Sequence, residues 1–174
     1  PIEQLAEHSS HLEVSYLLLH GELPNSEELR AFESAVSKNM KLDDHFKNIF
    51  DGFTSKSHPM AMVCAAIAGL AASHHEDLNI SDPEYRLNAA TQLIAKIPTI
   101  TAMAYRKSVE KQFIEPNADL SYAENFLYMM FSNPCEPYEI NPVYAKAMDR
   151  IFILHADHEQ NASTSTVRLA GSTG

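Results

Sequence analysis

The sequence predicts an all-α protein. Apolar residues recur every three or four positions along most of the chain, and capping residues or proline precede most of these runs. No segment shows sustained alternation of apolar and polar residues between tight turns, so we expect little or no sheet. The 174 residues are 45% apolar and 21% charged, which is ordinary for a soluble globular domain with one core.

Start and stop signals place the first helices. Ser10 precedes an apolar face that ends at Gly21, which predicts a helix between them. Asn25 and Glu28 have the spacing of a capping box, and an amphipathic face follows them as far as Met40. A short third helix is expected over residues 42–53, closed by a glycine and a polar run.

Residues 60–72 are apolar and small on most faces. Such a helix must be covered on most faces, either as a core helix of its own domain or by another subunit. Both alternatives remain open from the pattern itself.

The second half of the chain continues the helical pattern. Asp82 and Pro83 start a helix that Pro98 is expected to end or kink, and residues 100–109 are predicted as the next helix. Ser121 caps a helix that runs through Met130, and residues 141–155 form the last predicted helix. Residues 116–120 are the one linker-like stretch, and they are too short to divide the chain into two domains.

Charge and cysteine usage exclude several classes of partner. Thirteen Lys and Arg against 23 Asp and Glu give a formal charge of −10, which argues against nucleic acid or an anionic membrane as the main partner. The longest uncharged apolar stretch, residues 59–73, is shorter than the ~20 residues of a bilayer span. Cys64 and Cys135 lack the close partner that a zinc knuckle or redox motif needs, so we expect a reducing, cytoplasmic location.

Ionisable and hydroxyl side chains are dense after the last predicted helix. His155 lies on the apolar face of that helix and could be an ordinary helix-end residue, whereas His158 follows where the helix opens into a loop. Two histidines and a carboxylate could bind zinc, but the His-Glu-x-x-His arrangement is absent, so we expect no metal. Residues 163–166 lack the strand-to-helix elbow of a serine nucleophile and are expected to form a cap or loop.

Several separated motifs resemble the citrate synthase family in its bacterial, Gram-negative-type branch. The resemblance extends from Pro1 to Gly174, and four stretches carry it: Ser57-His58-Pro59-Met60-Ala61-Met62, Ile97-Pro98-Thr99-Ile100, the run from Asn125 to Glu139, and His155-Ala156-Asp157-His158-Glu159-Gln160-Asn161-Ala162-Ser163-Thr164-Ser165-Thr166-Val167-Arg168. The resemblance implies that residues 1–174 are an internal part of the large helical domain, without an N-terminal portion, the small domain and a C-terminal portion.

The resemblance also implies an activity. Citrate synthases are acyltransferases of the tricarboxylic acid cycle, which condense acetyl-CoA, as co-substrate, with oxaloacetate and use no covalently bound cofactor. The family's catalytic histidine and aspartate motifs would lie beyond Gly174, so no catalytic residue is expected within this chain. We therefore expect the fragment alone to be inactive.

The resemblance assigns roles to a few residues. His158 matches the histidine that binds oxaloacetate, Ser163 matches a serine that supports a downstream catalytic histidine, and His155 is a further supporting residue. Lys96 and Cys135 match residues of an NADH-binding allosteric site. Gln92 and His74 replace the arginine and tyrosine of sensitive members, which argues against inhibition by NADH.

The resemblance further implies a homodimer or hexamer. Its subunits would meet through the helices from Pro59 to Ala72 and from Pro98 to Val109. Two other functions remain open, namely a 2-methylcitrate synthase that uses propionyl-CoA and a non-catalytic helical interaction module with residues 60–72 as its docking face.

Overall fold

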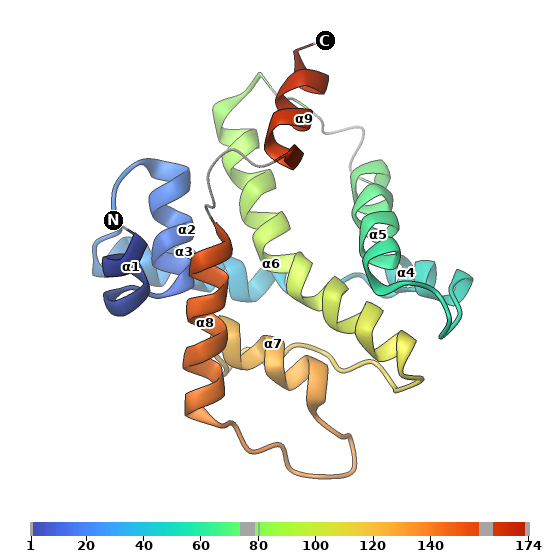
Figure 1. Cartoon of the computed structure of the whole chain (residues 1–174). Coiled ribbons are helices and arrows are strands. Elements are labelled where there is room, and N and C mark those ends of the chain that lie inside the picture. Colours follow the sequence, from blue (N-terminus) through green and yellow to red (C-terminus); the bar gives the residue numbers. More distant parts are fainter. Residues whose placement is uncertain (1, 74–78, 80, 157–161, 173–174) are drawn as a thin grey trace.

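The computed structural model describes residues 2–73, 79, 81–156 and 162–172, which fold into helices joined by turns and loops (Figure 1). No strand occurs in these ranges, which confirms the predicted all-α class. In chain order the elements are α1 (Ile2–His8), α2 (His11–His20), α3 (Ser26–Asn39), α4 (Asp44–Lys47), the 3-10 helix η1 (Asn48–Gly52), α5 (Pro59–Ser73), α6 (Pro83–Ser108), α7 (Tyr122–Phe131), α8 (Pro142–Ala156) and α9 (Ala162–Gly171).

Helix starts follow the predicted capping signals. The hydroxyl of Ser10 accepts the N–H of Glu13 at 3.2 Å, and the carboxylate of Glu13 accepts the N–H of Ser10 at 2.6 Å. Asn25 makes the equivalent arrangement with Glu28 at the start of α3. Gly21 ends α2 with φ 88°, a left-handed conformation that glycine adopts without a steric cost.

The predicted helix boundary at Pro98 is wrong. This proline lies inside α6, which runs unbroken from Pro83 to Ser108. Proline has no N–H, so the carbonyl of Ile94 loses its usual donor four residues later. The hydroxyl of Tyr122 in α7 donates to that carbonyl at 2.8 Å. A contact between two helices therefore replaces the missing bond and allows α6 to continue.

The sequence patterns failed to predict two helices, α1 and α9. α1 precedes the first predicted helix, and α9 contains Ser163–Thr166, which the sequence predicts as a cap or loop. The hydroxyl of Thr166 donates to the carbonyl of Ala162, four residues earlier, at 2.7 Å. This bond satisfies the hydroxyl within the helix, so the Ser/Thr run does not prevent helix formation.

α6 is the central helix of the described chain. It crosses the middle of the molecule, with α5 on one side and α2, α3 and α7 on the other (Figure 1). Two clusters of buried side chains lie against it. The first consists of Leu42, Phe50, Met62, Val63, Ala66, Leu70, Ile100, Met103 and Ala104, and the second of Leu12, Phe32, Val36, Met40, Ala95, Ala102 and Met129.

α5 lies at the edge of this chain and not at its centre. One side of the helix contributes buried residues to the first cluster, while the opposite side is exposed. We call this exposed side the α5 face, and it consists of Met60, Ala61, Cys64, Ala68, Ala71 and Ala72. Of the two alternatives from the sequence, a central core helix is therefore not what this chain forms.

Polar side chains of α6 bond the carbonyl ends of neighbouring helices. Lys96 donates to the carbonyl of Asn39 at 3.0 Å and Thr99 donates to that of Met40 at 2.8 Å, both at the end of α3. Arg106 is only 2% exposed and donates to Met130 at 3.1 Å, with further bonds to the carbonyls of Met129, Ser132 and Gln112. Cations at helix C-termini also complement the helix dipole.

We expect Tyr122→Phe to destabilise the protein by about 1–3 kcal/mol, because the partly buried carbonyl of Ile94 would lose its donor while the ring remains. Urea unfolding measures the change. The matched control is Tyr144→Phe, since the Tyr144 side chain is 66% exposed. Equal losses in the two variants would contradict the role of the Tyr122 hydroxyl.

The end of α6 gives a second prediction. Glu110 adopts φ 56°, and the N–H of Lys111 returns to the carbonyl of Arg106 at 2.8 Å. Glu110→Gly and Glu110→Ala both remove the bond that Ser55 donates to the Glu110 carboxylate, but only glycine enters the left-handed region freely. The glycine variant should be more stable than the alanine variant by about 1 kcal/mol in urea unfolding. An alanine variant of equal stability would contradict this account.

Candidate functional site

The residue with the strongest predicted role lies outside the described structure. His158 belongs to segment 157–161, which the structure does not describe. The helices on either side of this segment are α8, which ends at Ala156, and α9, which begins at Ala162. The structure therefore describes only the two borders of this segment.

His155 lies in the last turn of α8 and is exposed. Its Nδ1 is 2.8 Å from the carbonyl oxygen of Ile151. Because a carbonyl only accepts, Nδ1 carries the proton in this contact, and Nε2 is left with a lone pair when the ring is neutral. The bond holds the imidazole against the last turn of its own helix.

Ser163 is the second residue of α9, where it is exposed. All ten residues of α9 are exposed. The structure thus places His155 and Ser163 on two different helices that border the same segment, in positions open to solvent.

Lys96 and Gln92 line an open pocket of about 730 Å³ between α3, α4, α5 and α6. Lys96 is partly buried, and this burial lowers the pKa of its ammonium. The remaining lining residues are Asn39, Lys41, Leu42, Asp43, Asp44, His45, Phe46, Leu70 and Ser73. Cys135 is exposed in the loop between α7 and α8 and is not part of this lining, so the structure does not bring it together with Lys96 there.

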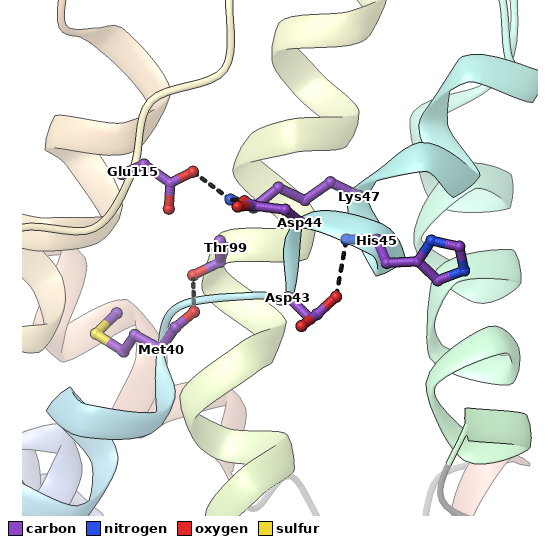
Figure 2. Close-up of polar contacts among 7 residues, drawn as sticks. All are labelled: Met40, Asp43, Asp44, His45, Lys47, Thr99 and Glu115. Atoms are coloured by element: carbon purple, nitrogen blue, oxygen red, sulfur yellow. Dashed lines mark hydrogen bonds and ion pairs between the residues drawn. The ribbon is translucent and has the colours of Figure 1, made fainter.

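An ion-pair cluster adjoins this pocket, because its member Asp44 is one of the lining residues. Figure 2 shows Lys47 between Asp44, at 2.7 Å, and Glu115 of the loop that follows α6. The hydrogen bond from Lys47 lowers the pKa of Asp44. Asp43 accepts the N–H of His45 at 2.8 Å and so caps α4. Sequence spacing could have indicated the pair of Asp44 and Lys47, but not Glu115, which is 68 residues from Lys47.

A second open pocket, of about 720 Å³, lies where α6 ends. Its lining residues are Phe53, Thr54, Ser55, Lys107, Glu110, Lys111, Gln112 and Phe113. Ser55 donates to the Glu110 carboxylate at 2.7 Å, which joins the loop before α5 to the loop after α6. The two lysines are in the last turn of α6 or just beyond it, where cations are expected from the helix dipole.

Neither a group of metal ligands nor a membrane-spanning helix is found among the described residues. In the described part of the chain, no three His, Cys, Asp or Glu side chains converge on a position for a metal ion. None of the helices within the same ranges has the length and apolar character to cross a membrane.

The chain resembles solved citrate synthases from three organisms. The enzyme from Pyrobaculum aerophilum is 35% identical with a TM-score of 0.86, and the alignment covers 99% of this chain and 44% of that one. The enzyme from Thermotoga maritima MSB8 is 32% identical with a TM-score of 0.81, and its alignment covers 99% of this chain and 43% of that one. The enzyme from Thermoplasma acidophilum was solved as a ternary complex with carboxymethyl coenzyme A and oxaloacetate. It is 31% identical with a TM-score of 0.87, and its alignment covers 99% of this chain and 44% of that one. The chain therefore spans less than half the length of these relatives.

The family model for the C-terminal domain of citrate synthase matches residues 1–174. The sequence motifs, the helical fold and this match over every residue agree with one another. The chain belongs to the citrate synthase family.

Proposed function

We propose that the protein condenses acetyl-CoA with oxaloacetate to give citrate and CoA, as a citrate synthase of the bacterial type. The observation that carries the proposal is the family match over the whole chain. A relative that is 31% identical binds oxaloacetate together with a coenzyme A derivative, which are the ligand classes this reaction requires.

The proposed reaction needs three kinds of group. A base removes a proton from the methyl group of acetyl-CoA, a donor stabilises the resulting enolate, and further donors hold and polarise oxaloacetate. The enolate carbon then attacks the keto carbon of oxaloacetate, and water hydrolyses the thioester to release CoA. We assign His158 to the third task, as a hydrogen-bond donor to oxaloacetate.

Supporting roles are proposed for the two border residues. The bond from His155 to the Ile151 carbonyl holds the last turn of α8, from which the chain enters segment 157–161. Ser163 lies in the first turn of α9, directly after the segment. We infer that these two residues orient the loop or its neighbours and do not perform proton transfer themselves.

We infer that the 174-residue chain alone does not turn over substrate. His158 could bind oxaloacetate, but a bound substrate without a base and a clamp for its carboxylates gains little of the required rate acceleration. The exposure of α9 supports this inference, because a reactive enolate needs a site from which water is excluded.

The allosteric role is proposed to be lost. A nucleotide with a diphosphate would require several cations, and neutral Gln92 lines the pocket beside Lys96. We propose that Lys96 is a remnant of such a site and infer that NADH does not inhibit the enzyme.

Both cysteines are free in the described structure, which supports a reducing, cytoplasmic location.

The activity is tested by release of free thiol from acetyl-CoA by the full-length gene product in the presence of oxaloacetate. His158→Ala should lower kcat/KM by about 100-fold or more, because a donor to the polarised oxygen is lost. His8→Ala is the matched control, since the His8 side chain is 77% exposed. The 174-residue chain should give no release, and NADH should leave the full-length rate unchanged.

Three results would contradict parts of the proposal. No release with either acetyl-CoA or propionyl-CoA would remove the enzymatic function and favour a helical interaction module. Faster release with propionyl-CoA would favour a 2-methylcitrate synthase. Equal rates in His158→Ala and His8→Ala would remove the assignment of His158.

We also propose that a second copy of the protein covers the α5 face. α5 contains no charged residue over its 15 positions, although one side of it is exposed. Leu93 and Ile97 of α6 add exposed apolar surface at 39% and 38%. Most residues from Pro98 to Arg106 are instead buried within this chain. The part of α6 with exposed apolar side chains therefore lies before Pro98. A homodimer is the simplest assembly that this surface supports.

Ala68→Glu should weaken this dimer by on the order of 100-fold or more, because it places a carboxylate within an apolar interface. Ala31→Glu places the same charge at an exposed position of α3 and should have no effect. Sedimentation velocity over a range of protein concentrations measures both. A monomeric parent, or equal association of the two variants, would contradict the proposed interface.

A further inference from the structure

Three helices meet at His11, the first residue of α2. Its imidazole centroid lies 5.0 Å from the ring of Tyr122 in α7 and 5.2 Å from the ring of Phe152 in α8. Its backbone N–H donates to both carboxylate oxygens of Asp149 in α8, at 3.2 Å each. His11 therefore joins the start of α2 to α7 and α8 through ring packing and one shared hydrogen bond.

The two ring nitrogens of His11 are in different situations. Nε2 is 3.4 Å from the hydroxyl oxygen of Ser15, and that hydroxyl donates to the His11 carbonyl at 2.9 Å. The oxygen can therefore accept a hydrogen bond from the N–H group at Nε2. Nδ1 is buried and has no hydrogen-bond partner within the described ranges. This arrangement fits the neutral ring with its proton on Nε2.

Protonation would place a new N–H and a positive charge where the structure provides no acceptor for Nδ1. Burial accordingly lowers the pKa of His11 from 6.5 to about 4. The rings of Tyr122 and Phe152 attract a cation over their faces, but they are inclined to the imidazole by 36° and 49°. The cost of removing the charged ring from water remains the dominant effect.

The titratable and charged groups near His11 come from each helix packed around it. α2 contributes Glu13, α7 contributes the phenol of Tyr122, and α8 contributes Asp149 and Arg150. Arg150 donates to the Ala6 carbonyl of α1 at 3.1 Å. From α3, Glu28 interacts with Tyr16, farther along α2. Asp149 accepts the N–H of His11 and so complements the positive end of the α2 dipole.

We propose that His11 is an acid-sensitive latch, which holds α8 against α2 and α7 while its ring is neutral and releases α8 when the ring is protonated in an opened state. The Asp149 bond and the Phe152 contact are broken in that opened state. Since α8 leads directly into segment 157–161, its release loosens the border of the proposed binding residue. The latch goes beyond the proposed function and stands without it.

The direction of the pH effect follows from the two states of His11. The opened state takes up a proton as the pH falls below 6.5, whereas the closed state does so only near pH 4. The latch therefore acts fully above pH 6.5 and weakens progressively between pH 6.5 and 4. The opening equilibrium should be up to about 30-fold more favourable at pH 5.0 than at pH 7.5.

Asp149 acts in the opposite direction. Burial is the main cause that raises its carboxyl pKa; Glu13 adds to the increase, and the bond from His11 opposes it. The closed state therefore binds this proton more readily than the opened state, and acid favours closure through Asp149 near and above its ordinary pKa of 3.8. The His11→Phe variant separates the two effects, because it keeps Asp149 and removes the titrating imidazole.

Hydrogen exchange of the full-length protein, corrected for intrinsic amide rates, tests the latch at pH 7.5 and 5.0. Amides of α2 and α8 should lose up to about 30-fold in protection at pH 5.0, while those of α5 should not. His11→Phe, which fills the aromatic site without a titrating group, should abolish the difference. His11→Gln should do the same, and His8→Gln, at an exposed position, should retain it.

Direct titration of His11 by NMR with labelled histidine decides the case even if both His11 variants fail to fold. A midpoint near 4 together with the pH-dependent loss of α8 protection supports the latch. A midpoint near 6.5, pH-independent protection of α8, or a His11→Phe variant that keeps the full pH dependence would each overturn it.

Discussion

The helices of this chain depend on side chains that bond backbone carbonyls left without a helical donor. The Ile94 carbonyl, opposite Pro98, receives the Tyr122 hydroxyl. The carbonyl end of α3 receives Lys96 and Thr99 from α6, and that of α7 receives Arg106. Each bond joins two helices as well as completing one. Because an unpaired buried carbonyl costs more than a typical hydrogen bond contributes, these contacts select one arrangement of helices around α6.

Contacts between helices also position α8, the helix that leads into the proposed binding segment 157–161. α8 is held at its middle by the pairing of Asp149 with the start of α2 and by the packing of Phe152. Its last turn ends with the bond from His155 to Ile151. The segment that carries His158 therefore begins from a helix that is packed against α1, α2 and α7, whereas it ends at α9, which buries none of its residues. The three solved relatives are each more than twice the length of this chain.

The distribution of charge separates the surfaces of the molecule. The chain has a formal charge of −10, yet α5 contains no charged residue, and its exposed side is made of alanine, methionine and cysteine. Small side chains on one helix permit close approach of another helix. We therefore propose that the apolar side that first indicated a buried core is covered by a second copy, with charge confined to the faces that remain in water.

The sequence is sufficient to predict the helical class, the caps at Ser10 and Asn25, the limits of α8 and the family, because these depend on local spacing or on motifs read in order. It predicted His158 as the substrate residue, and that assignment remains a prediction. The tertiary structure was needed to show that Pro98 lies within a continuous helix, since the donor to Ile94 is 28 residues away in the chain. It also decided that His11 is buried between rings of α7 and α8, because burial arises from packing between helices that sequence periodicity does not place relative to one another.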